Sequence, residues 1–323
     1  MKPSSAVLVC LFILSSVCPA VGRQMTLALQ WTPQAQFAGF YVAQEKGFYE
    51  EAGLDLKIFS GSADNTSSSR LADGTVDFAT MFLGTALERY ERGEPVVNIA
   101  QLIQHSSLLI VTRKDSGIER IEDLDGGRIA SWGAEFQVQA RGLFEQKGIH
   151  TSIVPSNDPV ELFLRGATEG TLAMWYNEYH TLLNFGLRED ELTYFFFNVT
   201  SFDFPEDGIY CLSSTCEQYR EEARALVEAT FRGWHYAFEH PEEALDIVIA
   251  KMEEEHIPAT RVHQRWMLEK MRVLLLADIG DEDSYGRLSE EQFANTVNAL
   301  KNAGIIESTI AYDRFYKDVI HVQ

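Results

Sequence analysis

The chain has 323 residues, 46% of them apolar, so it can bury a large core and exceeds one small domain. Its 48 acidic residues outnumber 27 basic ones and give a net charge of −21, which argues against a nucleic-acid surface rich in Lys and Arg. With 22 Gly, 9 Pro and no low-complexity tract, disordered and collagen-like classes are also excluded. We therefore expect a compact globular protein with one or two lobes and no nucleic-acid partner.

The first 22 residues have the pattern of a secretory signal peptide. The apolar run Ala6–Val17 is too short for a membrane span, which needs about 20 apolar residues. Small residues at Ala20 and Gly22 predict cleavage before residue 23 and export to the periplasm. The alternative is a lipid anchor at Cys18, but the two residues before it make a poor lipoprotein cleavage site.

Two cysteines, Cys211 and Cys216, remain in the exported chain. An oxidising compartment would permit a disulfide between them, and two unpaired core or loop thiols are the other interpretation. The cluster His235, Glu239 and His240 fits a solvated helical face, since nothing else nearby completes a metal coordination shell.

Short apolar strands alternate with amphipathic helices at the start of the exported chain. The expected strands are 26–31, 54–59, 76–80 and 96–102, and the expected helices are 35–46, 66–72 and 85–92. This alternation predicts an α/β fold with a mostly parallel sheet, right-handed crossovers and helices on both faces.

A second series begins at residue 107. It has expected strands 107–112, 128–131, 151–154, 172–174 and 193–197, with helices at 137–147, after Pro159 and at 178–185. One more strand, 208–212, precedes a helical tail of 217–239, 241–254, 258–276 and 289–303. We expect two lobes: 23–106 with 206–323, and an inserted lobe 107–205, each with a mostly parallel sheet flanked by helices.

Loops that follow the expected strands are rich in aromatic, amide and acidic residues. Ligands of open α/β sheets bind beyond the carboxyl ends of the strands, so these loops predict a cleft between the lobes. The candidate ligand-binding residues are Trp31, Gln36, Phe82, Trp132, Glu135, Trp175, Tyr176, Asn177, Glu178, Phe202, Asp203 and Phe204. Aromatic faces with a few carboxylates and amides suit a flat heterocycle, and the other interpretation places the aromatics in the core.

Glu178 is the sharpest candidate, because a carboxylate can accept two N–H bonds from an amino-heterocycle. Its alternative role is a helix N-terminal acid favoured by the macrodipole. Glu135 lies in a helix-entry loop, where its negative charge disfavours an anionic ligand. The two acids together predict a neutral or cationic ligand.

Several motifs occur in the order in which one family carries them. They are Leu29–Pro33, Gly39–Ala43, Lys46–Tyr49, Gly74–Phe78, Ala173–Tyr179 and Phe204–Tyr210. Over residues 25–238 the sequence resembles the SsuA/THI5-like (NMT1) family of solute-binding proteins of ABC importers. The resemblance implies a type II periplasmic-binding-protein fold, closure of two lobes around a ligand and delivery to an ABC permease in the inner membrane. The motifs around Trp31 and at Asn177–Glu178 most resemble members that bind thiamine pyrimidine precursors.

The same family includes the eukaryotic thiamine pyrimidine synthase, which consumes pyridoxal phosphate and one of its own histidines and uses iron. Where the resemblance places its active-site lysine and histidine, this sequence has Met81 and Thr85, and its cysteine-rich run has no counterpart. Without the amine there is no Schiff base, and without the imidazole there is no nitrogen donor. We therefore expect a protein that is not an enzyme and needs no cofactor and no metal.

The expected function is monomeric, periplasmic capture of hydroxymethylpyrimidine or formylaminopyrimidine for import. The alternatives are the pyrimidine-forming enzyme, a binding protein for riboflavin, a sulfonate or nitrate, and a ligand-sensing partner of a membrane kinase. Anionic cargoes need convergent positive charge, which the loops singled out here lack.

Overall fold

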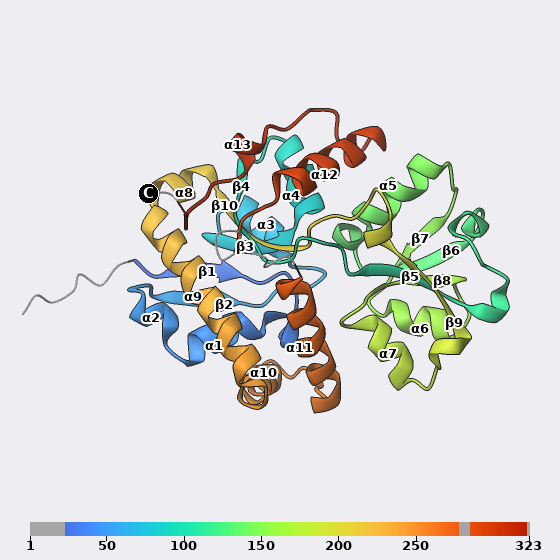
Figure 1. Cartoon of the computed structure of the whole chain (residues 1–323), viewed down its shortest axis with the longest axis horizontal. Coiled ribbons are helices and arrows are strands. Elements are labelled where there is room, and N and C mark those ends of the chain that lie inside the picture. The colour runs from blue at the N-terminus through green and yellow to red at the C-terminus, as the bar shows by residue number, and fades with distance from the viewer. Residues whose placement is uncertain (1–22, 278–284, 322–323) are drawn as a thin grey trace, which may run out of the picture.

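The computed structural model describes residues 23–277 and 285–321, and the predicted signal and Cys18 lie outside these ranges. Figure 1 shows two lobes side by side, each built around its own sheet and joined by extended segments. Each sheet has five strands and is covered by helices, which confirms the α/β two-lobed fold class.

The first sheet has the strand order β2-β1-β3-β10-β4. Its strands are β1 (Met25–Ala28), β2 (Leu56–Phe59), β3 (Phe78–Phe82), β4 (Val96–Gln101) and β10 (Asp207–Leu212). The helices between them are α1 (Ala38–Glu45), α2 (Phe48–Glu51), α3 (Ser67–Ala72) and α4 (Leu83–Glu91). We call this sheet and the helices that pack on it the first lobe.

The second sheet has the strand order β7-β6-β8-β5-β9. Its strands are β5 (Leu108–Arg113), β6 (Arg128–Ser131), β7 (Ser152–Pro155), β8 (Gly170–Met174) and β9 (Leu192–Phe196). The helices α5 (Val138–Lys147), α6 (Pro159–Leu164) and α7 (Glu178–Asn184) belong to the same stretch of chain, and together they form the second lobe. The boundaries after residues 106 and 205 stay a prediction.

The tail after β10 is helical, with α8 (Ser213–Gln218), α9 (Arg220–Glu239), α10 (Pro241–Glu254), α11 (Arg261–Leu276), α12 (Glu290–Asn302) and α13 (Tyr312–Phe315). The expected helix 217–239 is interrupted at Tyr219, which separates α8 from α9. Glycines bring α9 very close to α1, because a Cβ at Gly233 would lie 2.0 Å from the carbonyl oxygen of Gly39. The tail thus packs on the first lobe, against the helix that follows β1.

One strand in each sheet runs against the other four. β10 is antiparallel to both β3 and β4, and β5 is antiparallel to both β8 and β9. Each of the two is the first strand after the chain crosses between lobes, so it starts at the cleft, whereas the other strands end there. Loops after β1, β3, β6 and β8 therefore face one another across the cleft, where ligands of open sheets bind.

The two crossing segments, 102–107 and 197–206, are tied together by a buried carboxylate. Glu206 accepts hydrogen bonds from the Ser107 amide (2.6 Å), the Ser107 hydroxyl (2.6 Å) and the Leu108 amide (3.2 Å). Burial raises the pKa of Glu206 to about 8, although these donors favour the ionised form. This carboxylate fixes the pivot about which the lobes can move.

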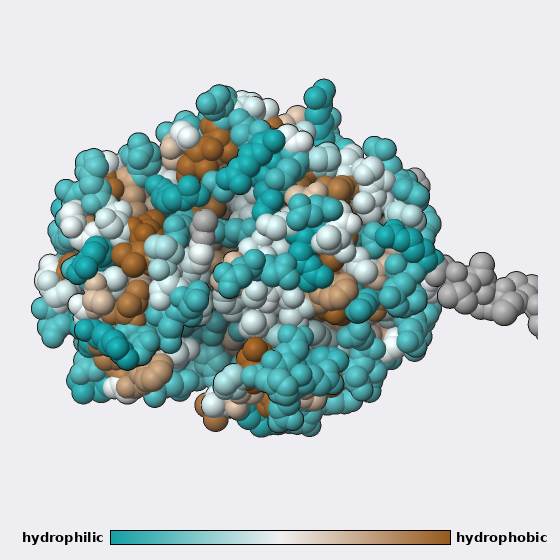
Figure 2. Space-filling model, turned by 180° about the vertical axis from the view of Figure 1, so that it is seen from behind, coloured by the Kyte–Doolittle hydropathy of each residue, from teal (hydrophilic) through white to brown (hydrophobic). Residues whose placement is uncertain are grey.

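Within the described ranges, no helix combines the length and the apolar character that a membrane crossing requires. Figure 2 shows the opposite face to Figure 1, where hydrophilic residues dominate and hydrophobic ones form separate small patches.

Candidate functional site

Side chains that follow three strand ends meet in the cleft. Trp31 follows β1, Trp132 follows β6, and Tyr176, Asn177 and Glu178 follow β8. The described residues around this space are Gln30, Trp31, Gln34, Gln36, Trp132, Phe136, Met174, Tyr176, Asn177 and Glu178. Six of the twelve predicted ligand-binding residues thus line one space between the sheets.

An aromatic cluster spans the cleft at this point. The Trp31 ring lies edge-on to Trp132, with centroids 5.0 Å apart, and edge-on to Phe136 at 5.2 Å. Phe136 in turn contacts Phe82, the last residue of β3, at 5.4 Å. Rings from the first lobe therefore pack directly against rings from the second. A planar ligand that enters here would replace a contact between two of these rings with a contact between a ring and the ligand.

The free space between these rings is divided in two. A space beside Trp31 and one beside Phe82 each have a volume of about 10 Å³, which is room for about one water molecule. Phe136 and Met174 line both spaces and separate them. A ring-sized ligand therefore enters by displacing Phe136 or by parting the lobes.

Glu178 lies buried at the start of α7 and already has three donors. Its Oε1 accepts from the Trp132 indole (3.0 Å) and the Asn177 amide (2.9 Å), and its Oε2 accepts from the Met174 backbone amide (2.8 Å). Burial raises the pKa of Glu178, while these hydrogen bonds oppose the rise. The Glu178 backbone amide also lowers this pKa by hydrogen bonding, so a ligand N–H would replace one of the donors that the protein supplies.

A second acceptor group lies at the end of β1. Gln30 and Gln36 donate to the two oxygens of Asp207 at 2.7 and 2.8 Å, and burial raises the pKa of Asp207 to about 6. The Gln30 side-chain oxygen, Oε1, is buried without a hydrogen-bond partner and belongs to the residues that line the cleft. A buried acceptor without a donor costs free energy, so this oxygen favours a ligand that brings an N–H or O–H.

Glu135 stands at the mouth of the cleft, beside the space near Phe82. It accepts a hydrogen bond from the Ser68 hydroxyl and lies 3.6 Å from the Arg89 guanidinium, both in the first lobe. Its side chain keeps 25% of its surface exposed. The structure therefore uses this predicted binding residue as a contact between lobes.

Four predicted residues are placed differently from the sequence-based expectation. Trp175 points away from the cleft toward α11, where Lys270 lies 4.4 Å above its ring and the side chain packs against an apolar cluster of the second lobe. Asp203 accepts from the Ser106 amide (2.7 Å) and contacts His105 (2.5 Å), so it fixes the crossing segments. Phe202 is fully buried in the core, and Phe204 lines only the space near Phe82.

Other sequence-based interpretations can be compared with the structure directly. Cys211 and Cys216 are free, buried thiols, which is the second of the two alternatives for this pair. Met81 is buried, and Thr85 lines the space near Phe82. In the part of the chain that the structure describes, no group of three or more His, Cys, Asp or Glu side chains is arranged to hold a metal ion.

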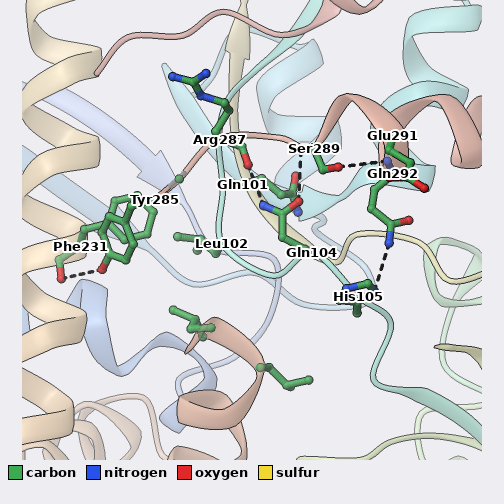
Figure 3. A pocket seen from close by; sticks show the side chains of 13 residues that line it. Gln101, Leu102, Gln104, His105, Phe231, Tyr285, Arg287, Ser289, Glu291 and Gln292 are labelled. Carbon is green, nitrogen blue, oxygen red and sulfur yellow. Dashed lines mark hydrogen bonds between the residues drawn. The ribbon is translucent and has the colours of Figure 1, made fainter. Parts of the chain in front are cut away.

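A larger cavity of about 400 Å³ lies outside the cleft, behind the end of β4. Figure 3 shows that polar groups around it bond to one another: the Gln104 side chain accepts from the Ser289 backbone amide, and the Gln292 side chain contacts His105. It contains none of the predicted binding residues. We therefore assign it to the packing of α11 and α12 against the crossing segment.

Sequence reasoning missed five residues of the cleft region, namely Gln30, Gln34, Phe136, Met174 and Asp207. Gln30, Gln34 and Phe136 lie within two or three residues of predicted binding residues, so a wider window around each strand end would have included them. Asp207 lies three residues after Phe204, but its hydrogen-bond partners come from the loop after β1 and from η1 (Ala35–Phe37), which the sequence pattern does not indicate.

Two sheets whose strand ends meet across an aromatic, acceptor-rich cleft form the architecture of the periplasmic-binding-protein fold. The alkanesulfonate-binding protein SsuA from Xanthomonas axonopodis pv. citri, solved with MOPS bound, has this fold, with a TM-score of 0.67 over 93% of this chain and 99% of that one at 12% identity. The chain belongs to the NMT1/THI5-like family, whose model matches residues 34–244.

Curated relatives separate binding proteins from enzymes. The riboflavin-binding protein RibY of Chloroflexus aurantiacus is 22% identical and covers 89% of this chain and 83% of its own. The formylaminopyrimidine-binding protein of Halalkalibacterium halodurans is 23% identical, with 89% and 88% covered. The THI5 pyrimidine phosphate synthase of Saccharomyces cerevisiae is 28% identical but covers only 39% of this chain. The chain is a solute-binding protein and not an enzyme.

Proposed function

We propose that this protein captures a thiamine pyrimidine precursor, hydroxymethylpyrimidine or formylaminopyrimidine, between its lobes as the solute-binding component of an ABC importer. Its partner is then a permease in the inner membrane, and the protein works as an exported monomer in the periplasm. The similarity to the formylaminopyrimidine-binding protein over 89% of the chain supports this assignment.

The chemistry of the cleft carries the proposal. The rings of Trp31, Trp132 and Phe136 offer faces for a planar ligand. The acceptors around them are the Glu178 carboxylate, where a ligand N–H would replace a protein donor, and the unpaired oxygen of Gln30. Among the described residues that line this space, none is Lys or Arg, so an aminopyrimidine with N–H donors fits better than an anion.

Riboflavin is the second candidate. The match to the riboflavin-binding protein RibY covers 89% of this chain. The isoalloxazine ring of riboflavin is also planar and also carries an N–H donor. It is larger than a pyrimidine, so it requires more displacement of Phe136, which separates the two small spaces. Binding of a pyrimidine therefore requires a smaller displacement of Phe136 than binding of riboflavin does.

Native mass spectrometry of the protein as purified tests the proposal. A co-purified ligand with the mass of a substituted pyrimidine supports it, and a flavin mass selects the second candidate. Tryptophan fluorescence of the stripped protein should then change on addition of the same compound, because Trp31 and Trp132 lie at the site. A co-purified sulfonate or nitrate contradicts the proposal. Tryptophan fluorescence that stays unchanged when each of these ring compounds is added contradicts it as well.

A further inference from the structure

Helix α11 reaches from the first lobe to the second. It is anchored in the first lobe, where Gln264 accepts a hydrogen bond from the Ala35 amide at 2.7 Å. On the other side its Trp266 packs against the apolar cluster of the second lobe and donates to the Trp175 carbonyl at 3.2 Å. Figure 1 shows α11 between the two lobes. Parting the lobes would break these contacts with the second lobe.

A chain of hydrogen bonds runs from α11 to the cleft carboxylate. His263 Nε2 lies 2.9 Å from Asn177 Oδ1, the Asn177 amide donates to Glu178 Oε1 at 2.9 Å, and the Trp132 indole donates to the same oxygen. An amide oxygen only accepts, so His263 Nε2 carries the proton and donates it. This bond turns the nitrogen of the Asn177 amide toward Glu178.

We propose that His263, in the first lobe, is a positioning residue for the ligand-binding carboxylate Glu178 in the second lobe. It acts through Asn177, and it acts only when the lobes are closed. The inference rests on the proposed function, in which Glu178 receives the N–H groups of the ligand. It couples closure of the cleft to completion of the site.

The same histidine faces a second one on α7. The Nδ1 atoms of His180 and His263 are 2.9 Å apart, and the His180 ring stacks on Trp266 at 4.7 Å. With the His263 proton on Nε2, its Nδ1 accepts from His180 Nδ1, and the Asn184 side-chain amide, 3.1 Å from the same His180 atom, then turns its oxygen toward it. Only one proton fits between the two Nδ1 atoms, so protonation of both rings sets two N–H groups against each other.

The charges around the pair act in the same direction. Burial, then His180, lowers the pKa of His263 to about 4, and burial, then Lys270 on α11, lowers that of His180. The other ionisable groups facing the pair are Glu178, through Asn177, and Tyr179 on α7, which contacts Trp266. Because both histidines would titrate near 6.5 when separated, protons favour the open form. The contribution of this pair to closure is therefore fully present above about pH 6.5 and declines as pH falls toward 4.

Calorimetry with 4-amino-5-hydroxymethyl-2-methylpyrimidine at several pH values tests this role. At pH 7.5, His263→Leu should bind roughly tenfold more weakly than wild type, because it leaves the buried Asn177 oxygen without a donor. His263→Gln keeps a donor at a similar position, so its affinity at pH 7.5 should stay within about twofold of wild type and fall less at pH 5. Arg265→Gln, on the same helix but paired with Glu242, should match wild type at every pH.

Unfolding of the ligand-free variants separates positioning from a structural role, and the denaturation midpoints of His263→Gln and Arg265→Gln should agree. The inference is overturned if His263→Leu binds like wild type at pH 7.5, or if His263→Gln loses affinity with falling pH as steeply as wild type. Should His263→Leu fail to fold, the pH profile of His263→Gln still decides the question. A wild type that binds no ring refutes the proposed function instead, so the two failures are distinguishable.

Discussion

Two carboxylates join the lobes, and they differ in burial and in partners. Glu206, at the crossing segments, is 1% exposed and is held by neutral hydroxyl and amide donors. Glu135, at the mouth of the cleft, is 25% exposed and faces the Arg89 guanidinium. A buried acceptor with several donors is costly to break, whereas an exposed ion pair contributes little. We infer that the contact of Glu206 at the crossing segments is permanent and serves as a pivot, whereas the contact of Glu135 at the mouth of the cleft can open.

The largest expected effect is at the pivot. Glu206→Ala leaves the Ser107 and Leu108 amides buried without an acceptor, which should lower the free energy of unfolding by about 3 kcal/mol. Urea denaturation followed by circular dichroism measures it. A loss below about 1 kcal/mol would show that the crossing segments do not depend on this carboxylate.

Next comes the cleft carboxylate Glu178, which is buried and lines the candidate site. Glu178→Gln should weaken binding of hydroxymethylpyrimidine by roughly thirtyfold, since a charge-assisted hydrogen bond is replaced by a neutral one. Glu135→Gln, the same change at the exposed site, is the matched control. Equal losses in the two variants would remove Glu178 from the binding role.

Burial also predicts how pH acts on the carboxylate beside the pivot. The pKa of Asp207 is raised to about 6, above the ordinary value that it regains on unfolding, so its contribution to stability is present at low pH and is lost as pH rises from about 4 to about 6. Asp207→Asn should remove about 2 kcal/mol of this decline in the free energy of unfolding. Urea titrations at pH 4, 5, 6 and 7 measure it, and parallel curves for the two proteins would contradict the assignment.

The smallest effect is expected at the mouth. Glu135→Gln should weaken ligand binding by no more than about threefold, because its partner Arg89 is reached through a partly exposed contact. In about 0.5 M salt the difference from wild type should disappear. A loss of ligand affinity of tenfold or more that persists in salt would contradict this, because the contact at the mouth of the cleft would then matter as much as the contact at the pivot.

Most of the fold follows from the alternation of strands and helices in the sequence. What the pattern could not supply is the direction of β5 and β10, because strand direction depends on where the chain re-enters a sheet after crossing between lobes. The break at Tyr219 was missed for a similar reason, since α8 and α9 are amphipathic in one continuous pattern.

The site was predictable wherever a side chain directly follows a strand that ends at the cleft. Trp31, Trp132 and Glu178 meet this condition and lie together. Trp175 meets it in sequence but packs against the apolar cluster of the second lobe and Lys270, because it lies in a turn whose course the spacing does not determine. Asp203 lies in a crossing segment, and only the three-dimensional structure reveals that its partners are the backbone and side chains of the other crossing.

Capture of a planar ring in the cleft can be measured directly by calorimetric titration of the stripped wild-type protein with hydroxymethylpyrimidine and with riboflavin. We expect saturable one-to-one binding of one of these compounds, and we expect it to be abolished or greatly weakened in Glu178→Gln. No detectable heat from either compound at millimolar concentration would contradict it.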